Sequence, residues 1–408
     1  MPPNRWDVVI VGGGIIGLSS AMALTGRHPG IRLIVLEKEE EIGRHQSGRN
    51  SGVIHAGLYY RPGSLKARTC VEGARAMVEF AAEHGIRHEL CGKLVVATSA
   101  EELPRLEELH RRGAANGVQG LELVGPERLR EIEPHAAGIR ALWSPGTGII
   151  DYPAVARAYA RTVRGRGGEI RTGAQVTGIR RLGGETVVET TAGDFPCGFL
   201  VNCAGLHADR VARLAGGRVG LQIVPFRGEY YEIAPERRSL VQGLIYPVPD
   251  PAFPFLGVHF TRRVGGAVEA GPNAVLAFMR EGYTKTQVDP RDLLETLAYA
   301  GFRKLARKWW RVGAREMVRS FSKAVFTRDL QRLVPEVRER DLVPGGAGVR
   351  AQAVDPEGNL LDDFAIVRTE GAIHVCNAPS PGATASLLIG RAIAEMAEEA
   401  CPALAARG

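Results

Sequence analysis

The stretch WDVVIVGGGIIGLSSAMALTG, residues 6–26, constrains the fold more than any other part of the chain. It reads as a buried strand, a glycine turn and a helix, and residues 31–39 read as a second buried strand. Gly12, Gly14 and Gly17 match G-x-G-x-x-G at the turn. Such glycines permit a tight turn, close approach of the backbone to a pyrophosphate, and close packing of the helix, whose positive N-terminal end favours a diphosphate. The segment therefore predicts a βαβ unit that binds a dinucleotide.

An acidic residue supports the same prediction. Glu37 lies twenty residues after Gly17 and ends the second predicted strand. At that place a carboxylate can accept hydrogen bonds from ribose hydroxyl groups. The chain contains one such glycine fingerprint, which argues against a separate site for NAD(P). The sequence therefore predicts a single bound dinucleotide.

The remaining sequence alternates between helical and strand patterns. Apolar residues at helical spacing predict a helix over 64–84. A polar helix is expected over 101–116, and further helices over 126–134 and 153–168. Residues 199–216 read as another strand, turn and helix, which returns the chain to a nucleotide-type sheet. Between 219 and 278 the chain is rich in strands and prolines, as is typical of an antiparallel sheet with interrupted edges.

These elements predict a mixed α/β (α+β) fold with two discontinuous domains, since 408 residues exceed one compact core. A Rossmann-like cofactor domain is expected to comprise residues 1–90, 145–215 and 335–408. An antiparallel-sheet substrate domain is expected to comprise residues 91–144 and 216–334.

Cysteine usage and the N-terminal sequence narrow the class of protein. The six cysteines show no C-x-x-C pair and no zinc spacing, so we expect reduced, buried thiols and no metal site. The first residues lack the pattern of a signal peptide, and the uncharged run near the N-terminus is interrupted by glycines, so no membrane span is expected. These features predict a cytoplasmic enzyme.

The excess positive charge is concentrated in one segment. The net charge is +7, and residues 302–328 carry nine Lys or Arg against one Glu. A solvated helix face is the favoured interpretation. Trp309 and Trp310 interleave with the charges, which leaves open a peripheral contact with the anionic inner face of the cell membrane and with a quinone. No nucleic-acid-binding motif accompanies the segment, so nucleic acid is not favoured.

Several long strings resemble a known family. The opening fingerprint, NCAGLHADR and GVRAQ resemble the D-amino-acid oxidase superfamily of FAD enzymes. More closely, the chain resembles the L-2-hydroxyglutarate dehydrogenase/oxidase family from residue 7 to about 394, through HQSGRNSGVIHAGLYYRPGSLKA, VPFRGEYY, GVRAQAVDPEGNLLDDF and CNAPSPGATAS. The resemblance implies FAD-dependent oxidation of L-2-hydroxyglutarate to 2-oxoglutarate by hydride transfer from C2 to flavin N5. The electrons would pass to a quinone or to oxygen.

The resemblance also implies which residues contact FAD. The glycine turn and Glu37 would hold the ADP half, and the loop at 45–52 would pass over the ribityl and isoalloxazine region. Val176 would border the adenine, Ala204 and Gly205 the diphosphate, and the turn at 381–384 the flavin. The implied residues are Gly12, Gly14, Ile15, Ile16, Gly17, Glu37, Lys38, His45, Gln46, Ser47, Asn50, Ser51, Gly52, Val176, Ala204, Gly205, Gly348, Val349, Pro381, Gly382, Ala383 and Thr384.

Oxidation of a 2-hydroxy acid also requires a base for the hydroxyl proton. His55 is the favoured candidate because it follows the flavin loop, and His259 is the second; water or another group is the remaining possibility. Some relatives attach FAD through a histidine near this loop, so His55 could instead be a covalent link.

The two carboxylates of the substrate need cationic partners. The resemblance matches Arg350 to the superfamily's arginine for the α-carboxylate. For the distal carboxylate the candidates are Arg227 and Lys66, with Tyr246 and Arg262 behind them. Surface charge is the alternative interpretation for each of these four.

Two other functions compete. An amine or amino-acid oxidase, such as a glycine or sarcosine oxidase, would share the fold and Arg350, but it needs no base for a hydroxyl proton. A flavin-containing module that binds or modifies RNA would use the basic stretch. The several candidates for a dicarboxylate clamp favour the hydroxy acid.

Overall fold

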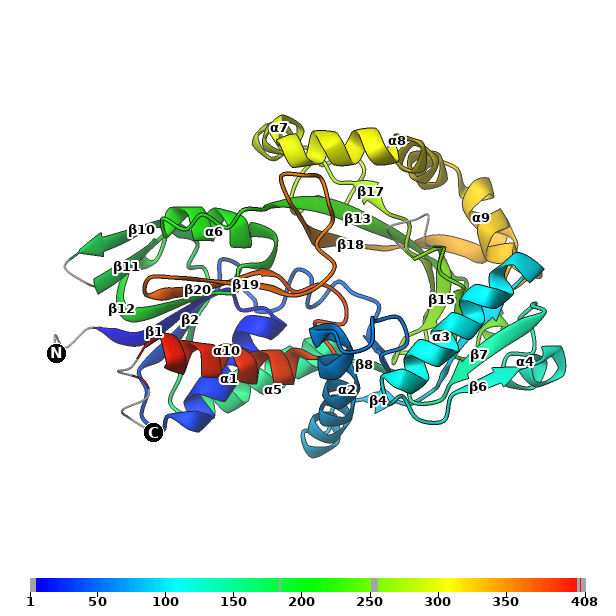
Figure 1. Cartoon of the computed structure of the whole chain (residues 1–408), viewed down its shortest axis with the longest axis horizontal. Coiled ribbons are helices and arrows are strands. Elements are labelled where there is room, and N and C mark those ends of the chain that lie inside the picture. Colours follow the sequence, from blue (N-terminus) through cyan, green and yellow to red (C-terminus); the bar gives the residue numbers. More distant parts are fainter. Residues whose placement is uncertain (1–4, 183–184, 251–255, 402–403, 405–408) are drawn as a thin grey trace. The chain divides into compact units, whose positions relative to one another are not determined.

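The computed structural model describes residues 5–182, 185–250, 256–401 and 404. The chain divides into two compact units, and each gathers segments that are distant in sequence (Figure 1). Unit 1 comprises Met1–Gly48, Tyr152–Val224 and Ala351–Gly408. Unit 2 comprises Arg49–Asp151 and Pro225–Arg350.

The limits of the units differ from the expected domain limits. Residues 49–90, 145–151 and 335–350 belong to unit 2, although they were expected in the cofactor domain, and residues 216–224 belong to unit 1. The first of these segments is held by a small sheet in which β3 (Val53–Ile54) and β4 (His88–Glu89) both pair with β8 (Gly148–Ile150). Strands this short have no periodicity to reveal their partners.

Among the described residues, unit 1 is built on an eight-stranded sheet with the order β10-β11-β12-β1-β2-β9; β20 pairs with β12, and β19 with β20. The pairs β12–β1, β1–β2, β2–β9 and β12–β20 are parallel. The strands are β1 (Trp6–Val11), β2 (Leu33–Leu36), β9 (Glu169–Arg171), β10 (Val176–Leu182), β11 (Glu185–Thr190), β12 (Gly193–Asn202), β19 (Ala365–Thr369) and β20 (Ala372–Asn377). The central strands are buried on both faces, which explains their continuous apolar sequences.

Helices cover both faces of this sheet (Figure 1). Val8 and Ile10 of β1 pack into the core formed with α1 (Ile15–Arg27), α5 (Tyr152–Gly165) and α10 (Ser386–Ala400). Val9 and Val11 point to the opposite core, which includes Val211 of α6 (Ala208–Leu214). The short helix η2 (Gly205–His207) precedes α6. The predicted Rossmann-like βαβ unit is confirmed.

Unit 2 contains a nine-stranded sheet within the described part of the chain, with the order β17-β13-β16-β15-β14-β5-β7-β6 and β18 beside β13. The pair β5–β14 is parallel, whereas β14–β15, β15–β16, β16–β13, β13–β17, β5–β7 and β7–β6 are antiparallel. The strands are β5 (Lys93–Ala97), β6 (Glu122–Val124), β7 (Arg140–Ser144), β13 (Gln222–Ile233), β14 (Leu244–Pro247), β15 (His259–Arg262), β16 (Val268–Gly271), β17 (Val275–Leu276) and β18 (Leu342–Val354). Residues 251–255, part of the expected proline-rich sheet region, lie outside the described residues.

Three helices of unit 2 begin at residues whose side chains cap them. Ser64 accepts a hydrogen bond from the Ala67 N–H at the start of α2, and Asp289 accepts one from Asp292 N–H at the start of α7. The helices are α2 (Leu65–Glu83), α3 (Leu103–Ala115), α4 (Pro126–Ile132), α7 (Pro290–Ala298), α8 (Ala300–Phe321) and α9 (Lys323–Gln331), with short 3₁₀ helices η1 (Ala100–Glu102), η3 (Pro235–Leu240) and η4 (Glu339–Asp341). In the described chain no helix combines the length and apolar character needed to cross a bilayer.

Candidate active site

The glycine turn between β1 and α1 combines tight packing with one open position. Gly12 has φ +109°, and a Cβ there would lie 2.3 Å from the carbonyl oxygen of Cys203. A Cβ on Gly17 would lie 2.0 Å from the carbonyl oxygen of Gly12. At Gly14 a Cβ would meet only the Ser47 Oγ, at 3.3 Å, among the described atoms within 4 Å. Gly12 and Gly17 therefore serve the packing of the turn, while Gly14 leaves its outer side open for a ligand.

Glu37 is fixed beside this turn at the end of β2. Its Oε2 accepts a hydrogen bond from the Gly13 N–H at 2.8 Å, and its Oε1 accepts one from the Glu39 N–H at 3.0 Å. The side chain is buried. Two backbone donors therefore hold the carboxylate at the place where a dinucleotide ribose would need an acceptor.

The loop after β2 returns to the start of α1. Ser47 Oγ accepts a hydrogen bond from the N–H of Ile15, the first residue of α1, at 2.8 Å. The Gly43 N–H donates to the carbonyl of Gly13 at 3.0 Å. The first turn of α1 contains no acidic residue, so its positive end is available to a diphosphate.

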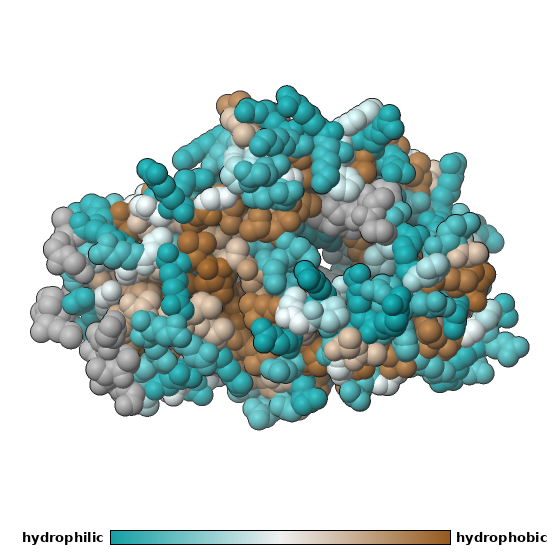
Figure 2. All heavy atoms as spheres, in the orientation of Figure 1, coloured by the Kyte–Doolittle hydropathy of each residue, from teal (hydrophilic) through white to brown (hydrophobic). Residues whose placement is uncertain are grey.

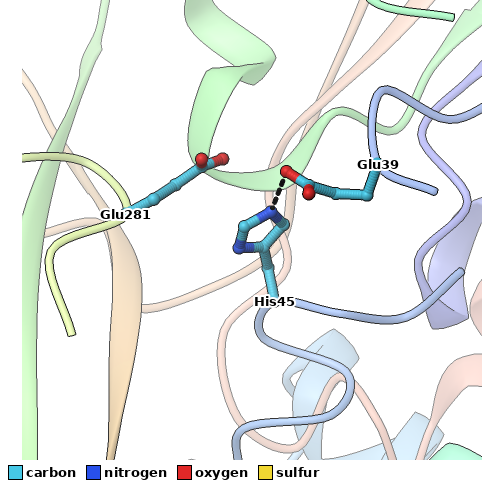
Figure 3. Close-up of side chains that lie close together, drawn as sticks. All are labelled: Glu39, His45 and Glu281. Carbon is cyan, nitrogen blue, oxygen red and sulfur yellow. Dashed lines mark hydrogen bonds and ion pairs between the residues drawn. The ribbon is translucent and has the colours of Figure 1, made fainter. Parts of the chain in front are cut away.

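A polar pair lies at the other end of this loop (Figure 3). His45 Nε2 and Glu39 Oε1 are 3.0 Å apart, and Lys38 also bonds to Glu39. The hydrogen bond from Lys38, together with that of His45, lowers the pKa of the Glu39 carboxyl although partial burial opposes the shift. Glu281, also labelled in Figure 3, belongs to unit 2. The expected cofactor residues Lys38 and His45 are thus tied to each other through Glu39.

Other expected FAD contacts lie on unit 1 as well. Ala204 and Gly205 follow β12, where the Cys203 N–H donates to the carbonyl of Val11 at 2.8 Å. Val176 begins β10, two residues after Ala174, whose N–H donates to the carbonyl of Glu37. These segments, and the glycine turn with its open position, fit an FAD diphosphate and ribose.

The small-residue turn before α10 is also fixed within unit 1. Thr384 Oγ1 and Tyr152 Oη are 2.9 Å apart, and Tyr159 Oη and Ser386 Oγ are 3.0 Å apart. Pro381, Gly382 and Ala383 precede Thr384 in the same turn. Of the remaining expected cofactor residues, Ile16 and Gln46 belong to unit 1, whereas Asn50, Ser51, Gly52, Gly348 and Val349 belong to unit 2.

The two candidate bases belong to one buried cluster in unit 2. His259 on β15 stacks on Tyr246 of β14, with ring centroids 3.8 Å apart. His259 Nδ1 lies 2.9 Å from the Gly257 carbonyl oxygen, which can only accept, so Nδ1 carries the proton and Nε2 the lone pair. Burial lowers the pKa of His259 to about 3, with Arg350 and Lys93 adding to the effect. Burial, Lys93 and His259 lower the pKa of His55 to about 3 as well.

Lys93, which the sequence did not indicate, lies in the same cluster. Its side chain is 1% exposed, and its Nζ lies 4.5 Å from the ring centroid of Tyr59 and 5.0 Å from that of Tyr246. Burial lowers the pKa of Lys93 to about 7. Lys93 and Arg350 both lower the pKa of His259, and Lys93 also lowers the pKa of His55, so both histidines are neutral beside cationic groups. Such an arrangement suits an anion with two charges and a transferable proton.

The candidates for the distal carboxylate differ in their surroundings. Arg227 donates through Nε and Nη2 to Glu229, at 3.0 and 2.8 Å, and through Nη1 to the carbonyl of Thr284 at 2.9 Å. Arg262 pairs with Glu89. Lys66 on α2 is buried, and its Nζ lies 5.7 Å from the Tyr60 ring. Arg227 and Arg262 already have carboxylate partners, which makes them poorer partners for a substrate.

Asn50 and Gly52 are arranged by local contacts in unit 2. The Gly52 N–H donates to Asn50 Oδ1 at 2.8 Å, and Arg263 bonds to the carbonyl of Asn50. Gly348 lies close to the backbone of Arg49, because a Cβ there would be 2.4 Å from the Arg49 carbonyl oxygen. The glycines at 52 and 348 thus allow close backbone packing at these positions.

Comparison with known proteins now identifies the family. Residues 7–396 match the family described as FAD dependent oxidoreductase. An L-2-hydroxyglutarate dehydrogenase of Indibacter alkaliphilus is 51% identical over 393 residues, which cover 96% of this chain and 98% of the relative. The chain belongs to the L-2-hydroxyglutarate dehydrogenase family of FAD-dependent oxidoreductases. The L-2-hydroxyglutarate dehydrogenase of Escherichia coli (strain K12) is 47% identical, covering 94% of this chain and 91% of the relative.

A solved structure supports the fold. The FAD-bound L-alpha-glycerophosphate oxidase of Mycoplasma pneumoniae superimposes with a TM-score of 0.79 at 22% identity, covering 96% of this chain and 94% of the oxidase. The fold class, the oxidoreductase class and FAD as the cofactor, all expected from the sequence, are confirmed. The names of the relatives favour neither the amine oxidase nor the RNA-binding alternative.

Proposed function

We propose that this protein oxidises L-2-hydroxyglutarate to 2-oxoglutarate and passes the electrons to a quinone or to oxygen. The observation that carries the proposal is the grouping of Lys93, His55 and His259 beside Tyr246, with Arg350 also acting on His259. A substrate with two carboxylates and one hydroxyl matches two cations and a base. The names of relatives that align over most of the chain give the same substrate.

FAD is held in this proposal by the glycine turn, by Glu37 and by the positive end of α1, with the loop at 45–47 and the turn at 381–384 completing its contacts. Bound FAD supplies the hydride acceptor for C2 of the substrate. The open side of Gly14 would hold the diphosphate of FAD, because glycine has no side chain to occupy that space.

The chain itself supplies the base and the substrate clamp. Arg350 binds the α-carboxylate through its planar guanidinium. We assign the base to His259 Nε2, because the bond from Nδ1 to Gly257 fixes the tautomer that leaves Nε2 as an acceptor. His55 is the alternative. The low pKa keeps the ring neutral before the substrate binds, and the substrate's two negative charges then offset the neighbouring cations and raise its proton affinity.

A second proposal concerns the basic segment, residues 302–328, and the helix that precedes it: α7 and α8 contact an anionic membrane surface. Hydrophilic side chains gather over these helices (teal in Figure 2). Arg303, Lys304, Arg307, Lys308, Arg311 and Arg315 are exposed on α8. Trp310 and Phe321 are exposed on the same helix, by 63% and 72%, and Leu294 on α7 by 66%. Exposed apolar side chains beside cations fit the interface of an anionic bilayer.

Anaerobic titration of the holoenzyme tests the main proposal. L-2-Hydroxyglutarate should bleach the flavin absorbance band stoichiometrically, and the D enantiomer, glycine and sarcosine should leave it unchanged. Bleaching by glycine or sarcosine, without bleaching by L-2-hydroxyglutarate, would establish the amine-oxidase alternative instead.

A further inference from the structure

Lys93 is buried without a carboxylate partner in the described part of the chain. It begins β5, where Leu94 and Val96 enter one core and Val95 and Ala97 another, so β5 is buried on both faces. Its Nζ has no hydrogen bond or ion pair to any described residue and contacts two aromatic rings. Ring contacts offset only part of the cost of burying an ammonium group, so this site calls for an anion.

A second unsatisfied group lies against Lys93. Tyr59 Oη is buried and has no hydrogen-bond partner among the residues that the structure describes. Burial raises the pKa of Tyr59, and Tyr246 adds to the shift, so the hydroxyl keeps its proton and remains a donor. A buried donor normally has an acceptor. Lys93 and Tyr59 therefore present two unused donor groups together.

We propose that Lys93 Nζ and Tyr59 Oη bind the second carboxylate of the substrate and so make the enzyme selective for a dicarboxylic over a monocarboxylic 2-hydroxy acid. This assignment rests on the proposed oxidation of L-2-hydroxyglutarate. It replaces Arg227, whose guanidinium donates to Glu229 and to the carbonyl of Thr284, and Arg262, whose Nη2 pairs with Glu89. Arg350 then remains for the α-carboxylate, and each carboxylate has its own cation.

The charge state of Lys93 depends on pH near neutrality, because the groups that face it do not stabilise its ammonium form enough to offset burial. They are His55, Tyr59, Cys70 on α2, Tyr246 on β14 and His259 on β15, and none of them is an acid that is ionised at pH 7. Burial lowers the pKa of Lys93 to about 7. The ammonium form therefore prevails below pH 7 and is lost as the pH rises, and with it the attraction for the second carboxylate.

Steady-state and stopped-flow kinetics of Lys93→Met holoenzyme test the inference with three L-2-hydroxy acids. They are L-2-hydroxyglutarate, its 5-amide and L-2-hydroxybutyrate. Removing one partner of a buried charge pair should lower kcat/KM for the diacid by about 10²-fold or more. The amide and the butyrate should change by less than about threefold, since the neutral Met side chain costs them no charge pair. An unchanged ratio of diacid to amide would overturn the assignment.

Three further variants test the same assignment. Tyr59→Phe should lower kcat/KM for the diacid alone, by about tenfold, because one hydrogen bond to a charged group is lost. If Lys66→Met collapses the ratio and Lys93→Met does not, Lys66 holds the second carboxylate. Flavin content and thermal unfolding of each variant show that it is folded. If Lys93→Met does not fold, Lys93→Arg, which keeps the charge, is used in its place.

The pH dependence provides a readout that a structural role would not give. In the wild type, kcat/KM for the diacid should fall as the pH rises through about 7, while that for L-2-hydroxybutyrate stays level. In Lys93→Arg the decline should disappear, because arginine stays charged. A decline that persists in this variant contradicts the role of Lys93.

Binding of glutarate separates this inference from the proposed function. Glutarate has both carboxylates but no hydroxyl, so calorimetry with the holoenzyme measures the second carboxylate without turnover. Loss of glutarate binding in Lys93→Met, with butyrate binding unchanged, supports the inference even if no 2-hydroxy acid is oxidised. Equal glutarate binding by both proteins overturns it whether or not the enzyme oxidises L-2-hydroxyglutarate.

Discussion

Tyr246 and His259 lie on neighbouring antiparallel strands with their rings stacked, 3.8 Å between centroids and 27° between planes. The stack fixes the plane of the imidazole, and the hydrogen bond to Gly257 fixes its tautomer. Ring orientation and tautomer are the two properties that a general base needs before the substrate arrives. The structure thus provides a preorganised acceptor at Nε2.

His259→Ala should therefore retain FAD and slow flavin reduction by L-2-hydroxyglutarate about 10²- to 10⁴-fold, the usual cost of losing a general base. The defect should shrink as the pH rises, because hydroxide can take the proton in place of the imidazole. Stopped-flow reduction across pH measures both effects.

His55→Ala is the matched variant. It should alter substrate affinity more than the rate of reduction. A larger and pH-rescued defect in His55→Ala would transfer the role of base to His55. If His55→Ala releases a flavin that otherwise stays with the acid-precipitated protein, His55 is a covalent link.

Alanine substitutions at two glycines of the turn should have different effects, one on FAD binding and the other on stability. Gly14→Ala places a Cβ 3.3 Å from Ser47 Oγ at a backbone conformation that alanine adopts readily, so the protein should fold but bind FAD poorly. Gly12→Ala places a Cβ 2.3 Å from the Cys203 carbonyl at φ +109°, so it should destabilise the fold by about 1–3 kcal/mol. Flavin-to-protein ratios and thermal unfolding of the apo forms measure the difference. Full flavin occupancy in Gly14→Ala would remove the diphosphate from this turn.

The βαβ unit could be predicted because its signals are local. The strand, the turn and Glu37 lie within 32 residues, and β1, α1 and the bonds to Glu37 confirm each step. The pairing of Arg227 with Glu229 has a local signal in the sequence. Glu229 follows Arg227 by two residues on β13, so the two side chains share a face and can pair.

Lys93 could not be predicted in the same way. KLVVA reads as an apolar strand with a polar first residue, which usually lies at an exposed edge. Its burial depends on β14 and β7, which pair with β5 on either side and come from distant parts of the sequence. The place of residues 49–90 in unit 2 has no local signal for a similar reason, since a two-residue strand such as β3 carries no pattern.

Substitution of Arg350 should affect substrate turnover, whereas substitution of Arg227 should affect stability. Arg350→Lys keeps the charge but loses the planar guanidinium, so kcat/KM for L-2-hydroxyglutarate should fall while FAD is retained. The fall should correspond to a loss of about 2–4 kcal/mol of transition-state stabilisation. Unchanged kinetics would remove Arg350 from the substrate site.

Arg227→Met should instead reduce stability. The variant leaves the largely buried Glu229 without its main cation. Loss of one partner of a buried ion pair typically lowers the free energy of unfolding by about 3–5 kcal/mol, and the partial exposure of Glu229 makes the loss smaller. Burial acts to raise the pKa of Glu229, but bonds from Ser320, Asn273 and Arg227 together lower it. The stabilisation is therefore present above the unfolded-state pKa of a glutamate and is lost as the pH falls through the folded-state pKa. Urea unfolding of wild type and variant at pH 7 and pH 4 measures this, and a purely kinetic defect would contradict it.

The exposed surface of α7 and α8 gives the last prediction. If it contacts an anionic bilayer, binding to vesicles with anionic lipid should weaken as salt rises, because exposed charges are screened beyond about 10 Å at 0.1 M. Replacing Arg307, Lys308 and Arg311 by Ser should weaken binding by roughly 1 kcal/mol per charge. The control replaces three exposed arginines of unit 1, Arg161, Arg164 and Arg171, and changes the net charge equally. Equal losses in the two triple variants would assign the effect to net charge, and equal sedimentation with neutral and anionic vesicles would leave α8 as a solvated face.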